Sequence, residues 1–226
     1  MNVIRNTRSS MSGISGLLAA LALALTLVAP VRAQEREYST IPTPQGTLAA
    51  TAFGINARGD VVGTFVDKNS VQHGFLLRKG KFTVIDFRDA QDTVAQGTVA
   101  RGISPDGDII GNYWLTGDPG IGSHGFLLTK KGEFEAVRYP GHRWETLQRI
   151  LPDGTILGCY HDHDFMATMR GVIIEREGAS EIDAFGSMHN GATPDLQLMV
   201  GFWFNMMDNQ TQGYMIENGV FTSFMV

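Results

Sequence analysis

The residues best suited to direct chemistry lie in one short polar stretch that follows an apolar run. His161 and His163 point to the same side of an extended chain, because side chains two residues apart share one face of a strand. Imidazole and carboxylate groups bind zinc and other divalent ions, which makes His161, His163 and Asp164 candidate metal ligands. A closed site needs about four ligands, and only the fold could bring His142 or His189 into reach. The alternative interpretation is a solvated polar loop.

Three tryptophans are candidates for ligand binding: Trp114, Trp144 and Trp203. Trp114 precedes a long glycine-rich loop, and Trp203 takes a neighbouring position in a later copy of the same sequence pattern. Aromatic faces near loops stack on sugar rings or anchor partner proteins. In the alternative interpretation, these rings fill gaps between packed sheets.

Signatures of catalysis are missing from the sequence. It contains no Gly-x-Ser-x-Gly nucleophile elbow, phosphate loop, dinucleotide-binding fingerprint or His-Glu-x-x-His motif. We therefore expect no catalytic residue and no cofactor, and we expect a non-catalytic module that binds an extracellular glycan or protein. Two alternatives stay open: a secreted hydrolase of polysaccharides and a metal-binding module. The paired carboxylates of a glycosidase are positioned by the fold, so the sequence does not exclude them.

The candidates lie within an internal repeat. Residues 54–65, 102–113 and 149–160 align as GINARGDVVGTF, GISPDGDIIGNY and RILPDGTILGCY, and residues 192–203 keep the end of this pattern but lose its turn. A second apolar block follows each copy. The glycine at positions 63, 111, 158 and 201 recurs at spacings of 48, 47 and 43 residues. A period in that range is typical of solenoids, propellers and other arrays.

Each repeat predicts four short strands. The first ends at a tight turn such as Ser104-Pro105-Asp106-Gly107, in which each residue type suits its position. The second and third strands carry consecutive apolar residues, which indicates that both of their faces are covered. No segment after residue 34 shows a helical period with caps. We therefore predict an all-β fold, a β-propeller-like array of four-stranded repeats with four or five blades; a β-sandwich or an open β-solenoid is the alternative.

The repeat also sets the expected domain organisation. We predict a single repeat domain over residues 34–226, and residues 37–42 resemble an extra fourth strand that could help to close a ring. The predicted repeats cover about 47–92, 93–141, 142–186 and 187–226.

Repetition separates residues that the fold needs from residues unique to one copy. His73, His124, Arg170 and Gln212 begin the third strands of successive repeats. All four side chains donate hydrogen bonds, so we expect structural bonds to a neighbouring loop rather than catalysis.

Glycines at two repeated positions, represented by Gly63 and Gly74, are expected where neighbouring sheets approach closely. The lone Cys159 lies in an apolar strand-like run and has no partner for an internal disulfide. We therefore expect a buried, inert thiol there.

The pattern G-I-N-x-x-G-x-V-V-G, followed by a variable loop and H-G-F-L-x-x-x-G-x-F-x-x-I-D, resembles the extracellular HAF repeat family of bacteria. The match is good over residues 54–87 and 102–139 and weaker in the last two repeats, where Arg170 and Gln212 replace the histidine. The resemblance implies a secreted, propeller-like bacterial protein. It brings no established activity and no functional residues.

The N-terminal segment has the pattern of a secretory signal peptide over residues 1–33. Arg5 and Arg8 precede an apolar run of 14 residues, and Val31-Arg32-Ala33 provides small residues at a cleavage site. An uncleaved anchor is the alternative, although a bilayer span needs roughly 20 residues. We expect secretion, to the periplasm or outside the cell.

Charge argues against two classes of partner. The chain carries 18 basic and 23 acidic side chains, and three of the arginines lie in residues 1–33, which leaves a net charge of −8 on the remainder. A negative surface repels nucleic-acid phosphates and anionic lipid headgroups. We expect no nucleic-acid partner and, after signal cleavage, no membrane contact; the oligomeric state stays open.

Overall fold

The computed structural model describes residues 38, 40–88, 95–118, 122–162 and 168–225. The chain divides into two compact units, Met1–Ile41 and Pro42–Val226, and all strands described below belong to the second. The expected signal peptide lies outside the described residues. Residues 37 and 39 of the expected extra strand also lie outside them, and its described residues form no strand. The described part of the chain holds no helix capable of spanning a bilayer.

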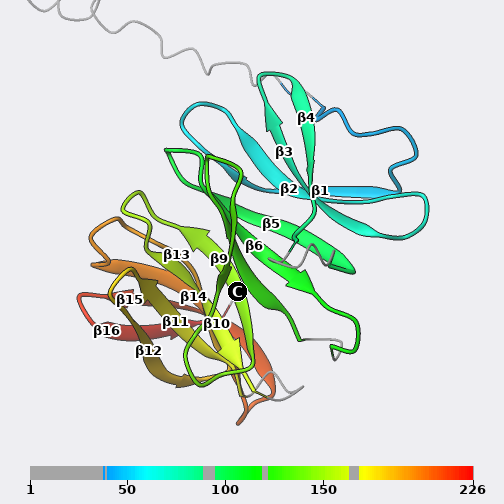
Figure 1. Ribbon diagram of the computed structural model, residues 1–226. Coiled ribbons are helices and arrows are strands. Elements are labelled where there is room, and N and C mark those ends of the chain that lie inside the picture. The colour runs from blue at the N-terminus through cyan, green and yellow to red at the C-terminus, as the bar shows by residue number, and fades with distance from the viewer. Residues whose placement is uncertain (1–37, 39, 89–94, 119–121, 163–167, 226) are drawn as a thin grey trace, which may run out of the picture. The chain divides into compact units, whose positions relative to one another are not determined.

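The described residues form sixteen strands in four antiparallel sheets of four (Figure 1). The first sheet contains β1 (Ala49–Ile55), β2 (Val61–Val66), β3 (Gln72–Arg78) and β4 (Lys81–Ile85). The second contains β5 (Gly97–Ile103), β6 (Ile109–Trp114), β7 (His124–Leu128) and β8 (Phe134–Val137). The third contains β9 (Trp144–Ile150), β10 (Ile156–His161), β11 (Arg170–Glu175) and β12 (Gly178–Phe185). The fourth contains β13 (Ser187–Ala192), β14 (Leu198–Asn205), β15 (Gln210–Glu217) and β16 (Val220–Phe224).

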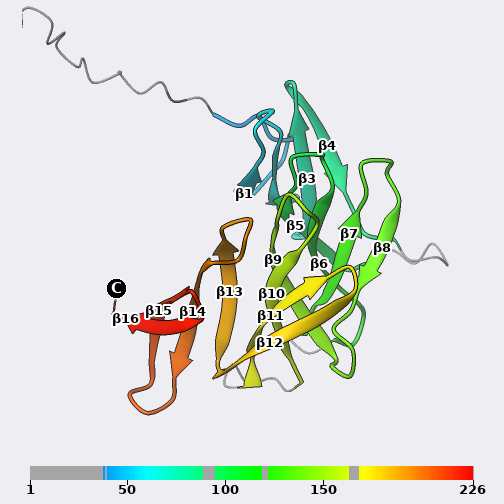
Figure 2. The same ribbon diagram turned by 90° about the vertical axis from the view of Figure 1, so that its left-hand side faces the viewer.

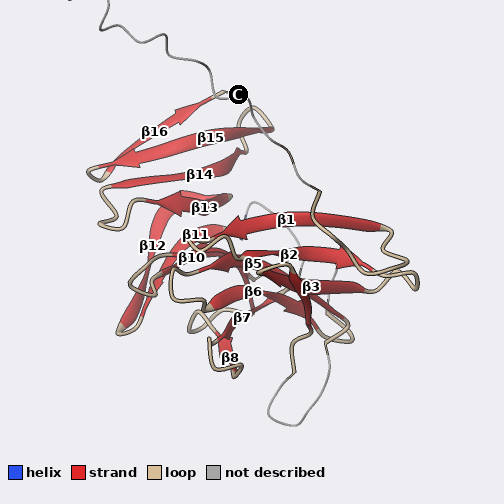
Figure 3. Ribbon diagram, turned by 90° about the horizontal axis from the view of Figure 1, so that it is seen from above, coloured by secondary structure: helices blue, strands red, loops and turns tan. Residues whose placement is uncertain are grey.

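Every sheet is a meander, because the order of its strands in space is their order in the chain. Figure 3 shows these strands joined by loops and turns. Each sheet falls within one of the four repeat ranges expected from the sequence. The predicted all-β class and the predicted four-stranded repeats are confirmed.

The turn between the first two strands is built as predicted in the first three sheets. Gly59 has a φ of 78°, a left-handed value that glycine adopts at no steric cost, and the equivalent glycines also have positive φ. In the fourth sheet the prediction that the turn is lost is wrong. Leu196 donates its N–H to the Thr193 carbonyl at 3.0 Å, as Gly59 does to Asn56, and takes a φ of 57°. The turn therefore persists without glycine.

The glycine in the middle of each second strand is needed inside its own sheet. A Cβ on Gly63 would overlap the Thr51 carbonyl oxygen of β1, beside a register shift in that strand, and would also meet the Phe75 ring of β3. The equivalent glycines of the other three sheets also face a carbonyl of their first strand. The expectation that a neighbouring sheet approaches at this position is wrong, because the irregular first strand occupies the space.

The glycine near the start of the third strand is where neighbouring sheets do meet. A Cβ on Gly74 would lie 3.2 Å from the Ala100 nitrogen of β5, and one on Gly125 would lie 2.8 Å from Leu147 Cδ1 of β9. Gly171 of β11 meets β13 in the same way. The first strands of the second, third and fourth sheets therefore each pack on the preceding sheet, a succession that can be followed in Figure 2.

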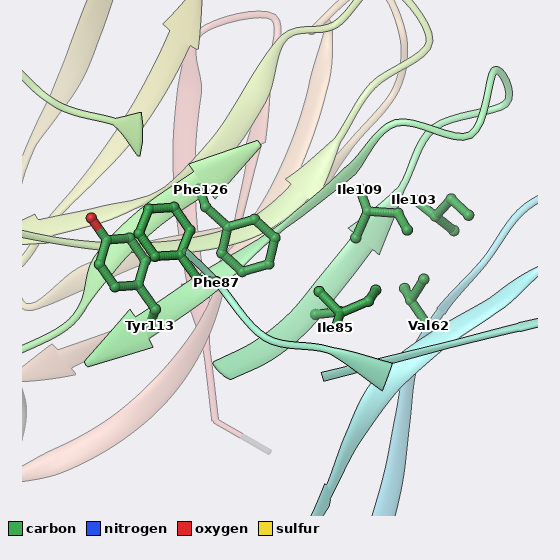
Figure 4. Packing of buried hydrophobic residues seen from close by; sticks show 8 residues of the cluster. Val62, Ile85, Phe87, Ile103, Ile109, Tyr113 and Phe126 are labelled. Carbon is green, nitrogen blue, oxygen red and sulfur yellow. The ribbon is translucent and has the colours of Figure 1, made fainter. Parts of the chain in front are cut away.

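A buried apolar cluster joins the first two sheets (Figure 4). Val62 and Ile85 of the first sheet pack with Ile103 of the second. Phe87, just after β4, stacks on Tyr113 with 3.7 Å between ring centroids. A second cluster joins sheets two and three through Ile110, Leu147, Ile150 and Ile156. The third and fourth sheets share a cluster built on Met199, Tyr214 and Ile216.

Candidate functional site

Two of the residues that begin third strands have the structural role that their repetition predicts. His73 bonds Asp86 through Nδ1 at 2.8 Å, and its ring stacks on Phe65. His124 lies with Nε2 3.2 Å from a carboxylate oxygen of Asp118, in the loop between β6 and β7. Each imidazole thus bonds an acidic side chain beside its own sheet, as the structural interpretation predicts.

The predicted metal ligands are placed in part. His161 is the last residue of β10, and it is buried. His163 and Asp164 lie outside the described residues. His142 bonds Asp162 through Nδ1 at 2.9 Å. Among the described residues, no group of three or more His, Cys, Asp or Glu side chains is arranged to hold a metal ion.

His189, also considered as a ligand, packs between two sheets. It is fully buried in β13, and its Nδ1 lies 2.7 Å from the Tyr214 hydroxyl. Its Nε2 has no hydrogen-bond partner among the described residues and faces Gly171. Burial lowers the pKa of His189 to about 4, so the ring is neutral at physiological pH.

Cys159 confirms the expectation of an inert thiol. Its side chain is buried in the middle of β10, and burial raises the pKa of the thiol to about 12. The reactive thiolate is therefore scarce at neutral pH.

A polar network that the sequence did not indicate joins the second and third sheets. Glu145 of β9 is fully buried and accepts hydrogen bonds from the Tyr139 backbone at 3.0 Å and from Arg138 at 3.3 Å. Arg138 also donates to His124 Nδ1 at 2.8 Å and to the Tyr113 hydroxyl at 3.1 Å. Burial raises the pKa of Glu145. The network therefore links the two sheets through one buried carboxyl group.

The three tryptophans predicted to bind ligand lie on three different sheets. Trp114 ends β6 and is half-buried, whereas Trp144 begins β9 and is buried, with the Arg143 guanidinium 4.6 Å above its ring. Trp203 lies in β14, edge-on to Phe221 with 5.8 Å between centroids. Trp203 lines an apolar cavity whose lining includes neither of the other two tryptophans.

This cavity, which we call the Trp203 cavity, has a volume of about 770 Å³. Its walls come from β12, β14, β15, β16 and the loop after β14, and they include Ile182, Met199, Trp203, Met206, Met207 and Phe221. The Trp203 Nε1 atom is buried and has no hydrogen-bond partner among the described residues. The cavity therefore offers a mainly apolar surface.

The loop after β14 holds the rim of the cavity in place. Asp208 accepts hydrogen bonds from Asn205 Nδ2 at 3.0 Å and from Gln212 Nε2 at 3.1 Å. Gln212 thus also makes the predicted bond to a neighbouring loop. The fixed loop exposes Met206 and Met207, which are 60% and 98% exposed. Trp203 is the residue of this site that the sequence predicted, and the adjacent methionines of the loop are a further signal in the sequence.

A scan of protein-family models and a search of curated proteins both found no match to this chain. Preformed concave surfaces with apolar walls and a few polar groups are the usual form of binding sites. The Trp203 cavity has that form and holds no acid, base or nucleophile in its lining.

Proposed function

We propose that this chain is a non-catalytic binding module, built on a propeller-like array of the HAF-repeat type, that takes an apolar segment of an extracellular protein into the Trp203 cavity. The observation that carries the proposal is the cavity itself: a large apolar hollow with two exposed methionines at its rim. Exposed apolar surface of this kind marks interaction sites in soluble proteins.

A propeller-like arrangement is supported by a second, smaller cleft of about 290 Å³. Its lining draws on the turn that follows the first strand of every sheet, including Asn56, Pro105, Pro152 and Pro194. First strands that gather their ends in one place are what a radial array requires.

The chemistry of the cavity favours a protein segment over a glycan. Sugars need several hydrogen-bonding groups around a stacking ring, whereas the walls here are formed mainly by Met, Ile and Phe side chains. Methionine-rich surfaces adapt to apolar side chains of different shapes.

The test is a titration with N-acetyl-leucyl-phenylalanine amide, followed by tryptophan fluorescence, with chitohexaose and cellohexaose in parallel. We expect peptide binding that Trp203→Ala abolishes and that Met207→Asp weakens at least about tenfold, since a charge at the rim disfavours apolar contact. Trp114→Ala is the matched control and should leave the affinity unchanged. Binding of the sugars with loss in Trp114→Ala would contradict the proposal, and release of reducing ends would indicate the hydrolase alternative.

A further inference from the structure

In the second, third and fourth sheets, one face of the first strand packs against the preceding sheet. We call this face, and the equivalent face of β1, the guest face. In the second and third sheets this face is buried: Ile103 and Ile150, at equivalent positions, are 8% and 6% exposed. In the first sheet the equivalent Ile55 is 64% exposed. Ala52, which corresponds to the fully buried Ala100, is exposed as well. The guest face of β1 thus has the composition of a contact surface and no sheet packed against it.

Each sheet also has a face that receives the following sheet, which we call the host face. Val62, Ile110 and Leu157 lie on the host faces of the first three sheets, and each is 0% exposed. The equivalent Val200 of the fourth sheet is 43% exposed. Gly213 keeps the glycine that receives a guest strand in the other three sheets, and here the half-exposed Phe224 ring of β16 lies over it. The fourth sheet therefore carries an apolar host face that no other sheet covers among the described residues.

The guest face of β1 and the host face of the fourth sheet are equivalent to the two faces that pack together between consecutive sheets three times in the chain. Ile103 packs in one buried cluster with Val62, and Ile150 packs in another with Ile110. By the same register Ile55 would pack on Val200. The residues named on both faces are apolar, so their contact would bury no unpaired charge.

The first and the fourth sheet are each packed on the sheet next to them in the chain. The Arg101 guanidinium lies 4.2 Å from the centre of the Phe53 ring, and a Cβ on Gly54 would lie 3.1 Å from the Arg101 carbonyl oxygen, so β1 packs closely on the second sheet. The His189 ring, packed on Gly171, holds the fourth sheet on the third in the same way.

We propose that the occupant of the host face is β1 of a second copy of this chain. The fourth sheet of one molecule receives the guest face of the other, and two such contacts related by a two-fold axis close a dimer of eight sheets. The contact continues the sheet-on-sheet packing already present three times in the chain. It uses the face of β14 opposite Trp203, because Val200 and Trp203 are an odd number of residues apart, so it is independent of the proposed ligand site.

The first test is sedimentation velocity of the purified chain over a range of concentrations. We expect a reversible dimer whose dissociation constant rises at least about tenfold in Val200→Asp and in Ile55→Asp, because each places a charge in the contact. Val71→Asp is the matched control, since it charges an exposed apolar residue in the loop between β2 and β3. A wild-type monomer at every concentration would overturn the proposal.

The second test uses disulfide formation to identify the partner. Chains carrying Ile55→Cys and chains carrying Val200→Cys, each with its own affinity tag, should form a mixed disulfide dimer on oxidation, while the native Cys159 stays unreactive. A chain carrying both substitutions that forms only an internal disulfide would overturn the proposal, because it would show that the array closes within one molecule. Circular dichroism of each variant separates loss of contact from loss of fold.

Discussion

A single buried imidazole makes the fourth sheet sensitive to acid. His189 is neutral in the folded chain, because burial lowers its pKa to about 4, while an exposed histidine in the unfolded chain titrates near about 6.5. Above about pH 6.5 the ring is neutral in both states and pH has no effect through this group. Between about pH 6.5 and pH 4 the unfolded chain binds a proton at this histidine and the folded chain does not. The free energy of unfolding therefore decreases as the pH falls to about 4.

We predict that His189→Leu removes this component of acid sensitivity. Leucine is the residue at the equivalent position of the third sheet, Leu147, and it does not titrate. The wild type should lose up to about 3 kcal/mol between pH 7 and pH 4 through His189, and the variant should lose correspondingly less. The measurement is urea unfolding at several pH values. Because the variant also loses the Tyr214 bond, the comparison is between slopes with pH, and equal slopes would contradict the prediction.

Strand β9 carries a buried acidic side chain, Glu145, that groups on neighbouring strands must satisfy. Glu145 occupies a position held by Ala50, Thr98 and Ser187 in the other sheets, and it is fully buried. Its carboxylate depends on Arg138, which follows β8 in the preceding sheet. The pair therefore fixes the end of the second sheet to the first strand of the third.

We predict that Arg138→Met destabilises the chain by about 2 kcal/mol at pH 7, because it removes one partner of a buried carboxylate and leaves the Tyr139 backbone bond to satisfy it. Part of the loss should be recovered by the additional substitution Glu145→Gln, which removes the charge. Arg149→Met, on an exposed arginine of the same strand, is the control and should change stability by less than about 0.5 kcal/mol. Equal effects of the two arginine substitutions, measured by chemical unfolding, would show that the buried pair is not important.

The strands and turns were accessible from the sequence because their physical causes are local. Consecutive apolar pairs such as Val61-Val62 predicted strands covered on both faces, and the glycine of the first turn predicted its positive φ. The fourth turn was missed because Thr193 and Leu196 reproduce the same backbone without the expected residues. The prediction for Gly63 was wrong because of the register shift in β1, which cannot be read from the spacing of apolar residues.

The candidate site was much less accessible. Trp203 was named from the sequence, but its cavity is formed by residues from three further strands and a loop that only the fold brings together. Glu145 and Arg138 were missed for the same reason, since their pairing depends on how two sheets pack. His161 was placed in β10, while its expected partners His163 and Asp164 lie outside the described residues.

The four described sheets form a succession in which each packs on the next. Stability in such arrays is close to a sum of the individual units and their nearest-neighbour contacts. Substitutions in separate contacts should then act independently, while substitutions within one contact should not.

We predict that Ile85→Val and Ile216→Val, in the first and the last buried cluster, destabilise the chain additively to within about 0.5 kcal/mol. Ile110→Val and Ile150→Val, which belong to one cluster, should show a larger coupling energy. Chemical unfolding of the single and double variants in dilute solution measures both. Strong coupling between Ile85→Val and Ile216→Val under those conditions would mean that the first and fourth sheets pack on each other within one chain.

The buried thiol of Cys159 can report how often the array opens. A small thiol reagent can modify it only when β10 separates from its neighbours, so the rate of modification counts opening events of the third sheet in the unaltered protein. Comparing that rate with the rate of global unfolding tells whether the middle of the array opens by itself or only when the whole chain unfolds.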